Sequence, residues 1–153
     1  MSNSALLKIT TELAGQIRSH GAETYPHECC GALLGRDTEV ADRRVYREIH
    51  ALYPLVNRRD DSPQNRFSVT SKDVLEAEKD ARARGLEVVG WYHSHPDHPA
   101  RPSQYDRDHA WPWYSYIIVS VANKIPEDMT SWRLADDRTD FECEEIELQQ
   151  AAW

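Results

Sequence analysis

The sequence predicts an α/β fold in which a mixed, partly antiparallel β-sheet is flanked by helices. Leucine and isoleucine recur at helical spacing over residues 4–20, which favours an amphipathic helix that ends at Gly21. Residues 86–94 and 114–122 are short apolar runs rich in β-branched side chains, as is typical of buried strands. A charged helical segment separates residues 67–70 from residues 86–94. This strand, helix, strand order predicts a crossover within one sheet.

Two further strands are expected between the first helix and the middle of the chain. An almost uninterrupted apolar run predicts a strand over residues 28–34, followed by a turn at residues 35–38. A second strand is expected over residues 40–51, with Val45 and Ile49 facing inward. The sequence also predicts a loop at residues 52–66, a helix capped by Ser71 and ended by Gly85, a short helix from Ser103 to Ala110, a loop at residues 123–128, and strands at residues 129–134 and 139–148.

The composition indicates a globular domain and argues against a membrane span and against nucleic acid as the main partner. The chain has 153 residues, of which 40% are hydrophobic, and we expect residues 1–153 to form a single domain. No apolar stretch approaches the roughly 18 residues of a membrane span, and the amphipathic beginning is unlike a signal peptide. The net charge of −8 argues against nucleic acid as the main partner. We therefore expect a cytoplasmic protein.

The three cysteines do not form a recognisable framework. Cys29 and Cys30 are adjacent and Cys143 stands alone, so neither a set of disulfides nor a zinc knuckle is predicted. Two interpretations stay open, namely small apolar side chains in or near the core, and a catalytic thiol.

Three candidate metal ligands lie where a predicted strand meets a short helix. His93 and His95 share one face of the strand because side chains alternate with a period of two. Ser103 and Asp106 follow at the start of the helix, and two imidazoles with one carboxylate suit zinc with a fourth position open for water. Two plainer interpretations remain, namely ordinary histidines at the end of a strand and a capping box formed by Ser103 and Asp106.

Other histidines offer alternative ligands. His98 lies in a proline-rich connection, and His109 shares a helix face with Asp106, which makes it the second choice as a ligand. His27 and Asp108 lie close to the candidate ligands in the sequence, but we expect both at the surface.

The spacing of these residues resembles the signature of the JAMM (MPN+) metalloproteases of the Mov34/PAD-1 superfamily. His93 and His95 are followed by seven residues, Ser103, two residues and Asp106, and residues 26–35 look like the first strand of that family, with Glu28 in the catalytic position. The resemblance implies a cytidine-deaminase-like three-layer sandwich and one zinc ion per chain. It also implies that both histidines and Asp106 bind the zinc, that Ser103 stabilises the tetrahedral intermediate, and that Glu28 is the general base and acid for a zinc-bound water nucleophile.

The resemblance is closest to the small bacterial branch, which includes peptidases of ubiquitin-like sulfur-carrier proteins. It implies a metallopeptidase that cuts a peptide or isopeptide bond at a tail ending in Gly-Gly, with residues 52–66 and 96–102 as candidate groove walls. Two alternatives stay open, namely a deubiquitinase-like isopeptidase and a non-catalytic MPN scaffold protein. A zinc deaminase is disfavoured because its Pro-Cys-x-x-Cys signature is absent.

Overall fold

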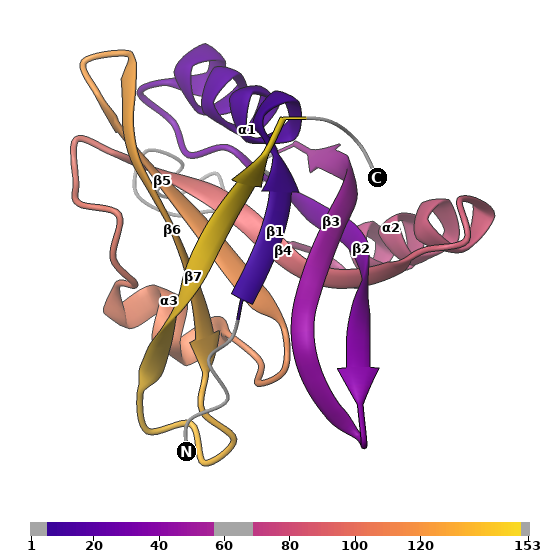
Figure 1. Cartoon of the computed structure of the whole chain (residues 1–153). Coiled ribbons are helices and arrows are strands. Elements are labelled where there is room, and N and C mark those ends of the chain that lie inside the picture. The colour runs from indigo at the N-terminus through magenta and orange to yellow at the C-terminus, as the bar shows by residue number, and fades with distance from the viewer. Residues whose placement is uncertain (1–5, 57–68, 151–153) are drawn as a thin grey trace.

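The computed structural model of the chain describes residues 6–56 and 69–150 (Figure 1). Seven strands and three helices follow one another in the order β1 (Leu6–Thr10), α1 (Thr11–Thr24), β2 (Cys30–Val40), β3 (Arg43–Leu55), α2 (Ser71–Ala83), β4 (Glu87–Pro96), α3 (Gln104–His109), β5 (Ser115–Ala122), β6 (Ile125–Leu134) and β7 (Phe141–Gln149). None of these helices is long and apolar enough to cross a lipid bilayer.

The strands form one closed sheet in the order β1, β3, β2, β4, β5, β6, β7. Strand β1 pairs in parallel with both β3 and β7, and β4 pairs in parallel with β5, whereas the other pairs are antiparallel. The expected mixed sheet with flanking helices is therefore confirmed. The expected three-layer sandwich is not what the strands form, because β1 bridges the two strands that would otherwise be sheet edges.

The closing strand β1 lies in a segment that the sequence pattern assigns to a helix. The predicted helix over residues 4–20 was wrong in its first part, because Leu7 and Ile9 are buried with the period of two that a strand requires. The Thr10 hydroxyl accepts a hydrogen bond from the Leu13 N–H (3.1 Å), so α1 begins only after it. The helix also runs past Gly21, whose missing side chain allows close packing against Val121.

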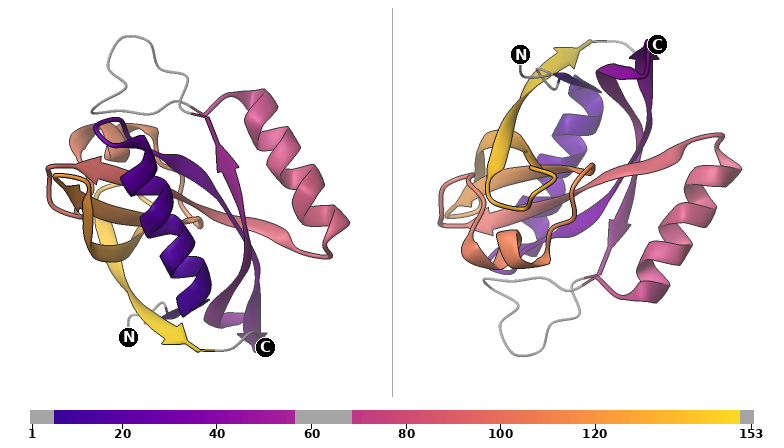
Figure 2. Two further views of the ribbon diagram at one scale, coloured as in Figure 1. Left: turned by 90° about the horizontal axis from the view of Figure 1, so that it is seen from above. Right: turned by 90° about the horizontal axis from the view of Figure 1, so that it is seen from below.

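Helices α1 and α2 cover opposite faces of β2 and β4 (Figure 2). Ala14 and Ile17 of α1 join a buried cluster that contains residues of β1 to β5. Ala77 and Ala81 of α2 pack instead on the other face of β2 and β4, against a cluster that includes Trp91. Strand β4 is thus covered on both faces and hydrogen-bonded along both edges, which explains its continuous apolar sequence.

The hairpin of β2 and β3 is longer than the sequence pattern predicts. The expected turn at residues 35–38 was wrong, because β2 continues to Val40 and the chain reverses at Ala41 and Asp42, which both have positive φ angles. Strand β3 also continues through Leu55 into the expected loop, of which residues 57–66 lie outside the described part. Ile49 is buried as expected, whereas Val45 is exposed.

Arg47 of β3 is fully buried, which is unusual for a charged side chain. Its guanidinium donates to both carboxylate oxygens of Asp37 (2.7 and 3.0 Å), to the carbonyl oxygens of Val89 (2.7 Å) and Trp113 (2.9 Å), and to the Ser115 hydroxyl (3.0 Å). This one side chain joins β3 to β2, β4 and the start of β5.

The Val89 carbonyl that Arg47 binds belongs to a β-bulge in β4. Leu33 of β2 pairs with Gly90 and the next residue, Leu34, pairs with Val88, so Val89 is the extra residue. The bulge shifts the alternation of side chains along the rest of β4. Arg47 therefore binds the β-bulge, and this bulge decides to which face of the sheet each later side chain of β4 points.

Other differences lie at the ends of elements. Of the strand predicted at residues 67–70, the structure describes only residues 69 and 70, and these do not form a strand. Thr70, and not the predicted Ser71, is the N-cap of α2. The first strand of the crossover is β3 instead. The loop predicted at residues 123–128 is a two-residue turn at Asn123 and Lys124, and β6 begins directly after it. The predicted strands that correspond to β4 and β5 are confirmed.

Replacing Arg47 should destabilise the fold more than replacing an exposed arginine. Arg47→Leu leaves the Asp37 carboxylate without its cation, which is expected to lower the free energy of unfolding by about 3–5 kcal/mol. Arg84→Leu is the matched control, because Arg84 also pairs with an aspartate (Asp80, 2.8 Å) but is exposed, and its loss should cost less than about 1 kcal/mol. Urea denaturation measures both, and equal effects would contradict the role assigned to Arg47.

Candidate metal centre

Strand β4 presents His93 and His95 on the same face as Trp91. Both imidazoles are buried. Trp91, His93 and His95 are every second residue of the strand, and side chains at such positions point to the same face. Ser94 between them points to the opposite face, where its Cβ lies 3.3 Å from the position that a Cβ on Gly21 of α1 would take. The prediction that both histidines share one face is confirmed.

Helix α3 supplies the third side chain through a capping box. The Ser103 hydroxyl accepts from the Asp106 N–H (3.1 Å), and the Asp106 carboxylate accepts in return from the Ser103 N–H (2.8 Å). The interpretation as a capping box is therefore confirmed. It does not exclude a ligand role, because the same carboxylate also faces the two imidazoles.

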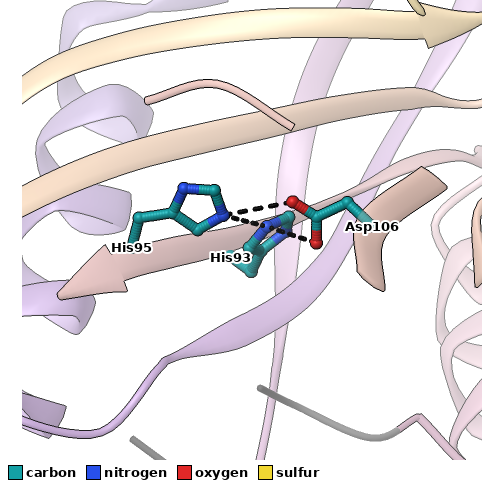
Figure 3. Close-up of side chains that lie close together, drawn as sticks. All are labelled: His93, His95 and Asp106. Carbon is teal, nitrogen blue, oxygen red and sulfur yellow. Dashed lines mark hydrogen bonds and ion pairs between the residues drawn. The ribbon is translucent and has the colours of Figure 1, made fainter. Parts of the chain in front are cut away.

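The three side chains form a compact triangle (Figure 3). The Nε2 atoms of His93 and His95 are 3.1 Å apart, and the Asp106 carboxylate oxygens lie 3.2 Å from the first and 3.1 Å from the second. Ligands about 2.0–2.1 Å from a tetrahedral zinc ion lie about 3.3 Å from one another, so the triangle has the size that zinc requires.

A backbone carbonyl sets the tautomer of His95. Its Nδ1 lies 2.8 Å from the Pro99 oxygen, and because a carbonyl only accepts, Nδ1 must carry a hydrogen. In the neutral ring Nε2 then presents a lone pair toward the Asp106 carboxylate, which is also an acceptor. Two acceptors at this distance require a cation or a proton between them, and a metal ion meets this need.

Asp106 is ionised in this environment. Burial of the carboxyl group would raise its pKa, but the neighbouring imidazoles of His93 and His95 outweigh burial and hold the pKa of Asp106 far below its usual range. A carboxylate that stays charged is the form that binds a metal.

Glu28 lies beside the triangle, immediately before β2. The pairing of Cys30 with His93 continues backward, since Ser94 N–H donates to the Cys29 carbonyl (3.2 Å) and Cys29 N–H donates to the Ser94 hydroxyl (2.8 Å). Continued by one more residue, the antiparallel register brings Glu28 opposite His95. The Glu28 residue is only 4% exposed. Ser94, which sequence reasoning gave no role, thus fixes the backbone that carries Glu28.

A cavity of about 450 Å³ contains the two predicted catalytic side chains and one predicted ligand. The described residues of its lining are Glu28, His95, His98, Pro99, Arg101 and Ser103. The structure therefore brings Glu28 and Ser103 together, although they lie far apart in the sequence. The sequence predicted His98 only as an alternative ligand and Arg101 only as part of the candidate groove wall at residues 96–102, and the structure places both in the lining of this cavity.

A second cavity, of about 760 Å³, lies along α3, and aromatic side chains line it together with Asp108 and Arg138. Trp91, Tyr105, Trp111, Tyr114 and Tyr116 contribute to its lining. A small hollow of about 40 Å³ shares Tyr105 and Tyr116 with it and is also lined by His93 and Asp106. Among the described residues, the cavity of Glu28 and the cavity along α3 share no lining residue. The first is lined by His95, whereas the second adjoins the small hollow lined by His93 and Asp106.

The remaining candidates lie outside the triangle. His109 stacks on Tyr105 and donates from Nδ1 to the Tyr105 carbonyl (2.8 Å), and in the described part of the chain it belongs to no group of metal-ligating side chains. His27 and Asp108 are exposed, as expected.

The cysteines divide between core and surface. Cys29 and Cys30 are buried, and burial raises the pKa of the Cys29 thiol to about 12, which disfavours a thiolate nucleophile. Cys143 was expected in or near the core but is exposed, because β7 turns Glu144 inward instead.

Three comparisons place the chain among known proteins. Residues 10–135 match the family model of prokaryotic homologs of the JAB domain. The chain is 30% identical over 127 residues to a desampylase of Haloferax volcanii, covering 80% of this chain and 86% of that protein. It is 30% identical over 116 residues to a probable TtuB-protein conjugate cleaving protease of Thermus thermophilus, covering 76% and 71%. A Desulfitobacterium hafniense protein of known solution structure has a TM-score of 0.80 and 33% identity, covering 95% and 94%.

Removing the Ser94 hydroxyl should loosen the backbone beside Glu28. Ser94→Ala leaves the buried Cys29 N–H without its acceptor, which is expected to lower the free energy of unfolding by about 1–3 kcal/mol. Ser19→Ala, at an exposed position of α1, should change it by less than about 0.5 kcal/mol. Urea denaturation and amide hydrogen exchange at Cys29 measure the effect, and unchanged exchange would show that the contact does not hold this backbone.

Proposed function

Because the chain belongs to the prokaryotic JAB-domain family of JAMM (MPN+) proteins, we propose that it is a zinc-dependent metallopeptidase. Its substrate is a peptide or isopeptide bond at the C-terminal tail of a ubiquitin-like or sulfur-carrier protein that ends in Gly-Gly. The observation that carries the proposal is the triangle of His93, His95 and Asp106 beside the cavity of Glu28 and Ser103. Two relatives are named a desampylase and a protein-conjugate cleaving protease, which supports hydrolysis at such a tail.

His93, His95 and Asp106 are the proposed zinc ligands, one ion per chain. Their three ligand atoms face one another at the spacing that zinc requires, and the carboxylate is held by the capping box while His95 is held by the Pro99 carbonyl. When bound, zinc is a Lewis acid that lowers the pKa of water and polarises a carbonyl group.

Glu28 is the proposed general base and acid. Its carboxylate accepts a proton from the attacking water and later donates that proton to the leaving amine. The geometry favours this role because Glu28 lies in the same cavity as His95, on a backbone segment that Ser94 fixes.

Ser103 is the proposed donor to the developing oxyanion. Its oxygen already accepts from the Asp106 N–H, so its hydroxyl hydrogen is available to donate into the cavity. A donor placed in this way is worth about 3 kcal/mol in the transition state. The reaction needs no covalent intermediate, in agreement with burial of Cys29 and Cys30.

Zinc content should depend on Asp106 but not on an equivalent capping residue elsewhere. Asp106→Ala removes one proposed ligand and one capping carboxylate, so zinc measured by elemental analysis should fall from one per chain to a small fraction of that. Asp73→Ala is the matched control, because Asp73 occupies the same position in the capping box of α2 and lies outside the triangle. It should lose comparable stability, about 1 kcal/mol, and keep its zinc.

Wild-type protein that takes up no zinc when zinc is supplied would contradict the metallopeptidase and leave a non-catalytic scaffold. Equal zinc loss in both variants would show that the loss comes from destabilisation alone.

Activity should depend on Glu28 without a change in zinc content. Glu28→Gln keeps the size of the side chain but removes its proton-accepting charge, so hydrolysis of a tail conjugate should slow by about 10²- to 10⁴-fold. Elemental analysis of the same sample should still find one zinc per chain. A Glu28→Gln variant that retains the wild-type rate would rule out the proposed base.

A further inference from the structure

The cavity that holds Glu28 contains a cation that the proposed mechanism does not use. Pro99, Arg101 and Ser103, from the turn-containing segment that joins β4 to α3, line this cavity. Ala100 between them is buried, and its carbonyl accepts from the Thr130 hydroxyl of β6 (2.7 Å). The segment is thus anchored on one side and presents Arg101 to the cavity on the other.

Arg101 is fixed at the backbone but not at its guanidinium. Its N–H donates to the Pro99 carbonyl (2.9 Å), the same oxygen that accepts from His95 Nδ1. Within the described residues the guanidinium forms no salt bridge, in contrast to Arg47, whose charge is fully paired inside the protein. In a chain with a net charge of −8, this exposed cation lies next to the proposed reaction centre.

The proposed chemistry decides which part of the substrate meets Arg101. Glu28 gives its proton to the leaving amine, so the residue that carries this amine must occupy the cavity of Glu28, His98 and Arg101. The acyl part of the substrate then extends toward the aromatic cavity, which adjoins the small hollow of His93 and Asp106 and shares no described lining residue with the first.

We propose that Arg101 is a specificity-determining residue that binds the free α-carboxylate of the leaving residue, with the His98 imidazole as a second donor. This inference rests on the proposed function and narrows its substrate to tails that carry a short linear C-terminal extension. In the reaction, water adds across the C–N bond, its hydroxyl going to the acyl carbon and its proton to the amine. The products are a tail with a new carboxylate and a free amino acid or short peptide.

The physical basis is the match between guanidinium and carboxylate. Arginine presents paired N–H donors that bind a carboxylate with charge and geometry together. A lysine-linked conjugate offers no such partner, because the carboxyl group of that lysine is part of a peptide bond. Discrimination between the two substrates therefore comes from one contact that only the linear extension makes.

The test compares substrates that differ only in that carboxylate. One carrier protein ending in Gly-Gly is prepared with an added alanine, with an added alanine amide, and with the tail linked to the ε-amine of a lysine within a peptide. Wild-type zinc-loaded enzyme should hydrolyse the free alanine with a kcat/KM about fivefold to tenfold above that for the amide. It should also prefer the free alanine to the lysine-linked peptide.

In Arg101→Gln the ratio of kcat/KM between the free alanine and the amide should fall to about one, and Arg101→Lys should restore part of it. Arg84→Gln, at the exposed arginine that follows α2 as its C-cap, should keep the wild-type ratio. A wild-type ratio near one, a ratio that survives Arg101→Gln, or a preference for the lysine-linked peptide would overturn the inference. Failure of zinc-loaded wild type to cleave any of the three substrates would instead contradict the proposed function itself.

Discussion

The buried guanidinium of Arg47 is the contact on which the placement of the candidate metal centre depends. Burying a cation is costly, and the cost is offset here because Asp37 and three oxygen acceptors surround it. One of these acceptors is the carbonyl of Val89, the extra residue of the bulge in β4. Because a shift of one residue turns every side chain to the other face, the bulge decides that His93 and His95, rather than Ser94, face α3.

The triangle is held by interactions that also build the local structure. The carboxylate of Asp106 starts α3 through the capping box and at the same time faces both imidazoles. The carbonyl of Pro99 orients His95 and also accepts from the backbone of Arg101. Ser94 fixes the segment that carries Glu28. Asp106, His95 and the backbone beside Glu28 are therefore each held in position by a contact outside the triangle, which favours a site that acts without rearrangement.

The two sides of the triangle differ in character, and this difference gives the proposed site a direction. Aromatic side chains line the larger cavity along α3, whereas the cavity of Glu28 is lined by proline, histidine, arginine and serine. A tail bound across the triangle as proposed would meet tryptophan and tyrosine side chains on one side and Glu28, His98 and Arg101 on the other. The proposed proton transfer from Glu28 assigns the side of Arg101 to the leaving group.

The sequence alone determined the parts of this protein that depend on local pattern. Strands β4 and β5, the start of α3 at Ser103 and the shared face of His93 and His95 follow from apolar runs, capping chemistry and the strand period. Tertiary structure alone decided that residues 6–10 form β1, because that strand is stabilised by pairing with β3 and with β7 at the far end of the chain. Burial of Arg47, the bulge at Val89 and the place of Arg101 beside Glu28 likewise depend on contacts between segments that are distant in sequence. The spacing of residues within one segment cannot predict contacts with another segment.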